Sequence, residues 1–104
     1  MKQAYLHYIK HALSAGHGIS VYVEGECELK RSTSYKAIKE EVEAWDDIPQ
    51  LVVSDDAGEI LGWALAHLWD KNEEPEGTIM DYSVTPYNEA WNETYKQEVD
   101  AIYY

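Results

Sequence analysis

Histidines, one cysteine and paired carboxylates are the residues of this chain that could perform chemistry. His7 and His11 are four residues apart, so on a helix both imidazoles would lie on one face and offer two nitrogens to a metal ion. No aspartate, glutamate or cysteine precedes Glu24, so this part of the sequence does not complete a ligand set. We therefore expect two exposed histidines on a polar helix face and no bound metal.

Nucleophilic catalysis would need a thiol or hydroxyl beside a base, and Cys27 and His67 are the natural candidates. Cys27 alternates with apolar residues, which predicts a side chain in the core. The negative charges of Glu26 and Glu28 disfavour a reactive thiolate there. His67 lies in an apolar run, where we expect a hydrogen-bonded packing residue, and no motif places a nucleophile beside it. The sequence therefore predicts no catalytic residue and no enzymatic activity.

Adjacent carboxylates could serve as hydrolase residues or calcium ligands. However, Asp55-Asp56-Ala57-Gly58 lacks the alternating oxygen ligands and the final glutamate of a calcium loop. Aspartate and glycine at a hairpin tip are explained by turn chemistry alone. The sequence contains no glycine-rich phosphate loop. We expect no cofactor.

Charge is distributed unevenly along the chain, whose formal net charge is −12. Residues 1–39 hold six lysines and arginines against three glutamates, whereas residues 40–104 hold seventeen acids against two lysines. An excess of negative charge of this size repels phosphate groups, so we expect the protein to bind neither nucleic acid nor an anionic membrane. It favours attraction to basic proteins, many of which bind nucleic acid themselves.

The densest acid lies in EEVEAWDD, residues 40–47, with five carboxylates in eight positions. Val42 and Trp45 would point inward from a helix, and acid near a helix C-terminus opposes the macrodipole. Local stability therefore does not explain these charges. We hypothesise a carboxylate surface that meets a basic partner and that would approach the charge density of duplex DNA if its members shared one face. The proposed members are Glu40, Glu43, Asp46, Asp47, Asp55, Asp56, Glu73, Glu74 and Glu76.

Aromatic usage is also unusual, with nine tyrosines, four tryptophans and no phenylalanine. Both side chains combine apolar area with a polar edge, which suits half-buried positions and interfaces. A tyrosine-rich rim around the core would give the same composition. Both interpretations stay open at the level of sequence.

The first half of the chain has the pattern of a helix, a hairpin and a second helix. Residues 3–15 carry apolar residues at helical spacing, and residues 19–30 alternate around a turn at Glu24-Gly25-Glu26. A helix over 34–46 follows N-cap residues. The residues that we expect to face the core are Tyr5, Leu6, Ile9, Ala12, Leu13, Ile19, Val21, Val23, Cys27, Leu29, Tyr35, Ile38, Val42 and Trp45.

The second half predicts a hairpin, a further strand and a C-terminal helix. Residues 51–69 contain two apolar runs around the Asp55 turn, which predicts a hairpin. Within residues 60–69 both the odd-numbered and the even-numbered positions are mainly apolar, which predicts a central strand covered on both faces. Residues 78–84 form a strand, and Thr85 and Pro86 begin the last helix. The buried side of that helix is expected to hold Tyr87, Trp91, Tyr95, Val99 and Ile102.

The element order α-β-β-α-β-β-β-α predicts a single α+β domain over residues 1–104, with a largely antiparallel sheet of four to five strands and three helices. A lone cysteine excludes an internal disulfide and is compatible with a reducing compartment. The sequence has no apolar block typical of a signal peptide or a membrane span. We expect a cytoplasmic protein.

LVVSDDAGEILGWALAHL, followed by IMDYSVTPYNEAW, resembles the central strands and following helix of GNAT-type acetyltransferases over about half of the chain. In that family a basic residue and spaced glycines at the start of the helix bind the pyrophosphate of coenzyme A. Here Tyr87-Asn88-Glu89-Ala90-Trp91 stands in that place, with acid for base and no glycine, so the phosphates would have no cradle. The resemblance implies a degenerate, acetyltransferase-like ligand-binding domain without activity.

ISVYVEGECELKRSTSYKAIKEEVE and GEILGWALAHL are similar to small uncharacterised proteins of bacteriophages and prophages. This resemblance implies an accessory protein that binds a host machine and inhibits it, including defence enzymes that handle DNA.

Together these features favour a small acidic, phage-derived binding protein that inhibits or decoys a basic host protein by occupation, without catalysis. Its carboxylates would speed encounter, and its tyrosines and tryptophans would anchor the complex. One alternative is a homodimeric structural or assembly module that buries the aromatic surface. Another is a small-ligand protein with a pocket near His67 or beside Trp63 and Trp69.

Overall fold

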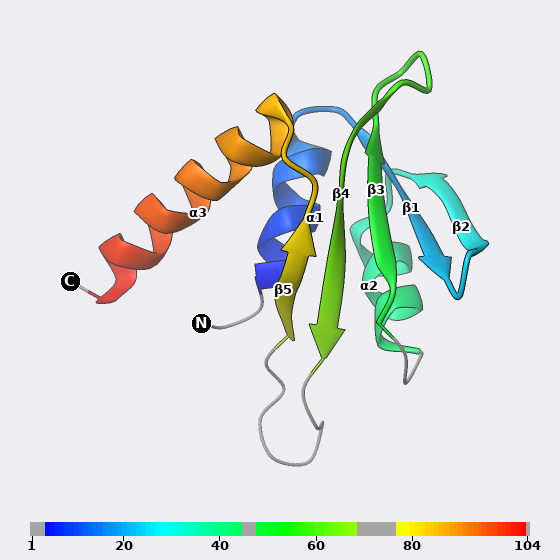
Figure 1. Ribbon diagram of the computed structural model, residues 1–104, viewed down its shortest axis with the longest axis horizontal. Helices are drawn as coiled ribbons and strands as arrows, with labels where there is room; N and C mark the ends of the chain where they lie inside the picture. Colours follow the sequence, from blue (N-terminus) through cyan, green and yellow to red (C-terminus); the bar gives the residue numbers. More distant parts are fainter. Residues whose placement is uncertain (1–3, 45–47, 69–76, 104) are drawn as a thin grey trace.

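The chain folds into a five-stranded antiparallel sheet and three helices (Figure 1). The computed structural model describes residues 4–44, 48–68 and 77–103. The strand order is β2-β1-β3-β4-β5, and the predicted α+β class and element order are confirmed. The elements are α1 (Ala4–Ser14), β1 (Gly18–Val23), β2 (Glu26–Ser32), α2 (Tyr35–Glu43), β3 (Gln50–Ser54), β4 (Ile60–Leu68), β5 (Gly77–Tyr82) and α3 (Pro86–Tyr103).

Local signals in the sequence explain where the helices begin and end. α1 stops at Gly16, whose φ of 84° favours glycine, and the amide of His17 donates to the carbonyl of Ala12. The Ser34 hydroxyl caps α2 by accepting from the amide of Ala37 at 3.2 Å. Thr85 caps α3 in the same way, as its sequence predicts.

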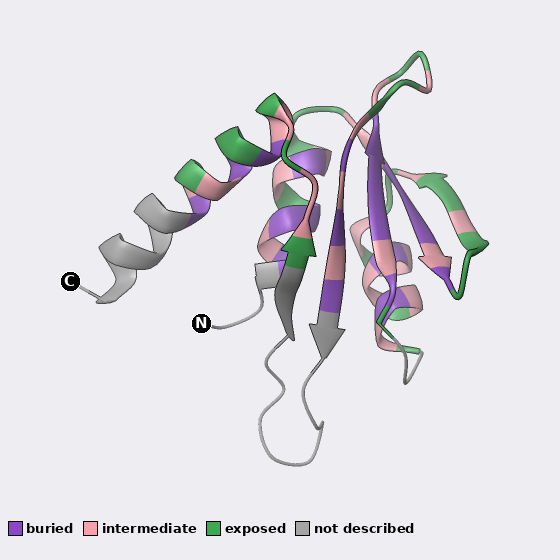
Figure 2. Ribbon diagram, viewed as in Figure 1, coloured by how far each residue is buried: buried purple, intermediate pink, exposed green. Residues whose placement is uncertain are grey.

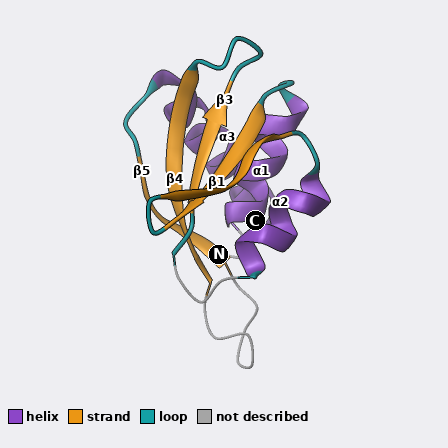
Figure 3. Ribbon diagram, turned by 90° about the vertical axis from the view of Figure 1, so that its right-hand side faces the viewer, coloured by secondary structure: helices purple, strands orange, loops and turns teal. Residues whose placement is uncertain are grey.

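The helices occupy one side of the sheet (Figure 3). α1 and α2 cover the central strands, and α3 packs against α1 beside β5 (Figures 1 and 3). Within the described residues, no helix covers the opposite face. Among the described elements, helices therefore cover one side of the sheet.

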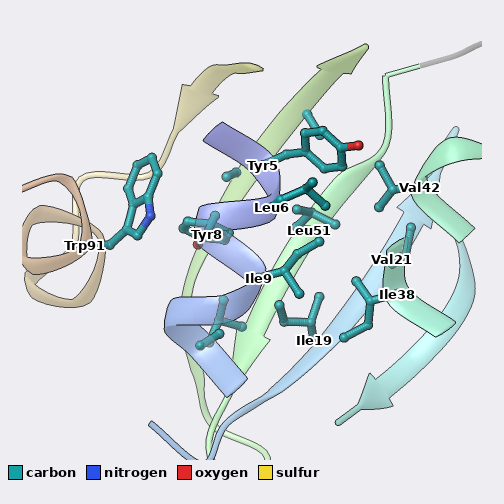
Figure 4. Close-up of a cluster of buried hydrophobic side chains, with 14 of the residues drawn as sticks. Tyr5, Leu6, Tyr8, Ile9, Ile19, Val21, Ile38, Val42, Leu51 and Trp91 are labelled. Carbon is teal, nitrogen blue, oxygen red and sulfur yellow. The ribbon is translucent and has the colours of Figure 1, made fainter. Parts of the chain in front are cut away.

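The core lies between that buried face and the helices (Figures 2 and 4). Tyr8 is fully buried, although the apolar stripe read from the sequence did not include it. Trp45, Val99 and Ile102, which were expected in the core, have side chains outside the described residues. The buried side chains of this core cluster are Tyr5, Leu6, Tyr8, Ile9, Ala12, Ile19, Val21, Val23, Ile38, Val42, Leu51, Val53, Ala64, Ala66, Trp91 and Tyr95.

The prediction that β4 is covered on both faces is wrong. Gly62, Ala64 and Ala66 are buried under the helices, whereas Trp63 and Leu65, on the other parity, are half-exposed. Small residues face the helices on this strand, and α3 packs against them. Hydrophobicity alone does not distinguish this arrangement from burial on both faces.

The prediction that Cys27 faces the core is also wrong, because its side chain is exposed. Strand β2 pairs Leu29 with Val21 but Cys27 with Tyr22, so β2 contains one extra residue between the two pairs. This β-bulge reverses the alternation, and Cys27 follows Tyr22 on the face away from the helices.

One buried asparagine, Asn88, joins α1, β4 and the segment before α3. Its Oδ1 accepts from the Tyr8 hydroxyl at 2.7 Å. Its Nδ2 donates to the carbonyls of Trp63 at 3.0 Å and Ser83 at 2.9 Å. A Cβ on Gly62 would lie 2.8 Å from Asn88 Oδ1, so only glycine leaves room for the amide. We call these contacts the Asn88 network.

We expect Asn88→Ala to lower the free energy of unfolding by about 3 kcal/mol, because several buried polar groups lose their partners. Urea denaturation measures this change. Asn92→Ala, one turn further along α3 at a half-buried position, is the matched control and should change the value by no more than about 0.5 kcal/mol. Similar losses in the two variants would contradict the role assigned to Asn88.

Two tyrosines with buried hydroxyls, Tyr8 and Tyr87, should differ in their response to loss of that hydroxyl. Tyr8→Phe leaves Asn88 Oδ1 without its donor and should cost about 1.5 kcal/mol. The Tyr87 hydroxyl is buried and has no hydrogen-bond partner among the described residues, so Tyr87→Phe should leave stability unchanged or increase it. Thermal and urea unfolding of the pair test this, and a larger loss for Tyr87→Phe would refute it.

Candidate functional site

The sheet face opposite the helices carries large apolar side chains. Across β3 and β4, Val52 pairs with Trp63 and Ser54 with Ile60. Gln50 of β3 lies between Tyr22 of β1 and Leu65 of β4 in the next row. Directly opposed residues share a face of the sheet. We define the open face as Tyr22, Val52, Ile60, Trp63 and Leu65.

The open face is partly accessible and lies outside the core cluster. Ile60 is 64% exposed, Tyr22, Trp63 and Leu65 are half-buried, and Val52 between them is 8% exposed. None of the five belongs to the cluster packed under the helices. Grouped apolar side chains with a polar surround mark interaction sites on protein surfaces. Here the group includes one tyrosine and one tryptophan, the residue types enriched among interface anchors.

The size of the open face suits the centre of an interface. Three strands about 4.8 Å apart are together roughly 15 Å wide, and a length of about five residues along a strand is roughly 16 Å. The open face therefore covers about 240 Å². A standard protein interface buries about 800 Å² on each partner. The open face could therefore supply the desolvated centre, with the remaining contacts coming from its surroundings.

One edge of this surface carries an acidic side chain. The Leu65 row ends at Asp81 of β5, which is exposed. At the other edge Cys27 is opposite Tyr22, whereas Glu26 is opposite the buried Val23 and therefore belongs to the other face of the sheet. An apolar centre beside a carboxylate matches a partner that combines apolar and basic side chains.

The structure describes four of the nine carboxylates predicted to form a partner surface. Glu40 and Glu43 lie in α2, which precedes the first residue of β3, and Asp55 and Asp56 follow the last residue of β3. The two pairs are therefore near opposite ends of this strand and do not form one cluster (Figure 1). Asp46, Asp47, Glu73, Glu74 and Glu76 lie outside the described residues.

In α2, both Glu40 and Glu43 have a lysine four residues earlier on the same face of the helix. Lys39 Nζ lies 2.8 Å from Glu43 Oε1, and this contact raises the pKa of Lys39. Glu43 also accepts from the Tyr5 hydroxyl at 2.9 Å. Lys36 Nζ lies 4.0 Å from the exposed Glu40. Glu43 thus ties α2 to α1, and Glu40 remains accessible to a partner.

The two aspartates after β3 have different roles. Asp55 Oδ1 accepts from the amides of Ala57 at 3.0 Å and Glu59 at 2.9 Å, which is the turn chemistry predicted from the sequence. Asp56 is exposed. Both line a hollow together with Lys30 and Arg31, so cations are interleaved with acid at this end.

The expectation of exposed histidines on α1 is wrong. His7 Nδ1 accepts from the indole of Trp91 at 3.1 Å, and the His7 ring lies 5.0 Å from that of Tyr95. The His11 ring lies 5.6 Å from that of Tyr87. Helix α3 packs over this polar side of α1, which the sequence pattern of α1 alone does not reveal.

The described part of the chain contains no group of three His, Cys, Asp or Glu side chains that could hold a metal ion. His67 pairs with Thr78 through the backbone of β4 and β5, but its side chain lies outside the described residues, as does Trp69. The residues that sequence reasoning missed are the open-face members as a set. Cross-strand register, which brings them together, is a tertiary property.

Comparison of the chain with protein-family models, curated proteins and solved structures gives no match. The acetyltransferase and bacteriophage resemblances therefore stay predictions. No helix within the described residues has the length and apolar character needed to cross a membrane.

Burial raises the pKa of the Tyr5, Tyr8 and Tyr87 hydroxyls above the ordinary value of 10.0, and the hydrogen bond to Glu43 raises that of Tyr5 further. The resulting stabilisation is fully present below pH 10 and is lost as pH rises, because the unfolded chain then releases protons that the folded chain retains.

We therefore expect the urea midpoint to fall as pH rises above about 10, with these hydroxyls ionising only as the protein unfolds. Absorbance at 295 nm and far-ultraviolet circular dichroism, recorded together against pH, provide the measurement. Tyr8→Phe should remove one late-ionising group. Ionisation of all tyrosines near pH 10 with an unchanged dichroism spectrum would show that burial does not protect them.

Proposed function

We propose that this protein is a small acidic binding protein that occupies a basic surface on a partner protein and acts without catalysis. The observation that carries the proposal is the open face, an apolar patch with the exposed Asp81 at one edge, on a chain whose net charge is −12. A face of this kind loses contact with water when a partner covers it, and that loss drives association.

Anchoring and attraction come from different residues. Tyr22 and Trp63 provide large rigid side chains whose burial slows dissociation. The net charge of −12, together with exposed carboxylates such as Asp81 and Glu40, speeds encounter with a positively charged protein. Charge therefore governs mainly the association rate, and the open face governs mainly the lifetime of the complex.

The partner that this chemistry favours is a basic, nucleic-acid-handling or defence protein of a host cell. The bacteriophage resemblance supports an inhibitor or decoy acting in the host cytoplasm. Close imitation of DNA would require the predicted carboxylates to share a face, and the described members lie near two ends of β3. We therefore place the open face at the centre of the interface and the acids around it.

A second candidate is a homodimeric assembly module in which the open face meets a second copy. The observation in its favour is the same apolar patch, since self-association would also remove it from water. Size-exclusion chromatography with light scattering separates the two. A stable dimer disrupted by Trp63→Ala favours assembly, and a monomer favours a different partner.

The main test is affinity capture with open-face variants. Trp63→Ala and Tyr22→Ala should each weaken the captured complex by at least about tenfold, because anchor residues dominate interface energy. Val84→Ala is the matched control, since Val84 is 82% exposed and lies outside the open face. Circular dichroism and urea unfolding verify that each variant is folded.

The charge component has its own readout. Glu40→Lys with Asp56→Lys, or a rise in salt, should slow association with little change in dissociation, measured by surface plasmon resonance. The proposal fails if the captured protein is not basic, or if the Val84 and Trp63 variants bind equally well.

A further inference from the structure

A hollow of about 500 Å³ lies at the end of the sheet where the β3–β4 turn is found. Small-molecule sites have volumes of about 300–1,000 Å³. Gly16 and Gly18, around the start of β1, line the hollow together with Lys30 and Arg31 at the end of β2 and Thr33 directly after it. Asp55 and Asp56 complete the lining. This hollow is separate from the open face residues.

The backbone of Arg31 has an unusual conformation. Its φ is 44°, in the left-handed region that non-glycine residues rarely adopt. Strand β2 has an irregular register here, because Ile19 pairs with Ser32 and Val21 with Leu29. The Arg31 amide donates to the Ser20 hydroxyl at 2.9 Å, and Ser20 is only 4% exposed. A buried hydroxyl therefore holds a bulge that redirects the Arg31 side chain.

The redirected side chain reaches the β3–β4 turn. A Cβ on Gly58 would lie 2.8 Å from Arg31 Nη1, and Gly58 itself has a φ of 85°. Glycine at this position thus admits the guanidinium as well as forming the turn. The bulge in β2 and the absence of a side chain at Gly58 together allow the Arg31 side chain to lie against the β3–β4 turn.

The Arg31 guanidinium forms no hydrogen bond or ion pair with any residue that the structure describes. The nearby Asp55 Oδ1 already accepts from the amides of Ala57 and Glu59. A guanidinium has five N–H donors in a planar fork that matches the two oxygens of a carboxylate or phosphate. Lys30 adds a second cation and Thr33 a hydroxyl to the same hollow.

We propose that this hollow binds the phosphate or carboxylate group of a small ligand, with Arg31 as the bidentate partner and Lys30 and Thr33 as additional donors. Backbone strain stored at a functional residue is a recognised feature of ligand sites. The carboxylates of Asp55 and Asp56 in the lining, together with the net charge of −12, disfavour extended polyanions such as nucleic acid. The site is independent of the protein partner proposed above.

The first test is titration with inorganic phosphate, followed by ¹H–¹⁵N NMR. We expect saturable shifts of the Gly16, Gly18 and Gly58 amides and of the Arg31 Nε–H group. A parallel titration with succinate shows whether phosphate or carboxylate binds more tightly. Unsaturable shifts, or shifts spread over the whole surface with both probes, would overturn the proposal.

Substitution of Arg31 separates binding from stability. Arg31→Lys keeps the charge but not the fork and should weaken the tighter probe at least about tenfold. Arg31→Gly should abolish binding and raise the melting temperature, because glycine accepts the positive φ. Lys36→Gln, which removes an exposed cation from α2, is the control and should change affinity less than about twofold.

Asp56→Asn gives a prediction of opposite sign. Removing this carboxylate from the lining should strengthen phosphate binding several-fold, because a like charge at the site is lost. Equal phosphate affinity in the wild-type, Arg31→Gly and Asp56→Asn proteins would place any bound anion elsewhere and refute the assignment.

Discussion

The hydrogen bonds of Asn88 hold three segments of the chain in one arrangement, and the remainder of the structure depends on them. They connect α1 through Tyr8, β4 through the carbonyl of Trp63, and the segment before α3 through Ser83. All these groups are polar, so leaving any of them buried and unpaired would cost about 1–3 kcal/mol. The amide fits because Gly62 presents no side chain. With this arrangement in place, α3 lies against α1, and His7 contacts Trp91.

The same arrangement explains why one face of the sheet is open. All three helices lie on one side of the sheet, and strand β4 has small residues on that side and large residues on the other. Gly62, Ala64 and Ala66 face the helices, and Trp63 and Leu65 face away. Large side chains on an uncovered face are not required for packing the core. The proposed role of these side chains is contact with a partner, and the net charge of −12 is the reason for proposing a basic one.

Charge in this protein is more local than its net value suggests. Glu43 serves α1–α2 packing through Tyr5 and Lys39, and Asp55 serves its own turn. Glu40, Asp56 and Asp81 are exposed and available for attraction at a distance. The end of the sheet that carries Asp56 also carries Arg31, whose positive φ sets it apart from the other cations that the structure describes. An overall acidic chain thus presents two cationic side chains, Lys30 and Arg31, toward one hollow.

The sequence by itself determined the element order, the ends of the helices and most of the core, because periodicity, caps and turn residues act over a few neighbouring positions. It also identified Asp55 as a turn residue. The side of Cys27, the cover over His7 and the exposure of Trp63 were decided by the tertiary structure alone. A bulge, a helix docked from the far end of the chain, and the placement of all helices on one face depend on contacts between distant residues. For the same reason, only the fold separates Asp55 from Glu43 and directs Arg31 toward Gly58.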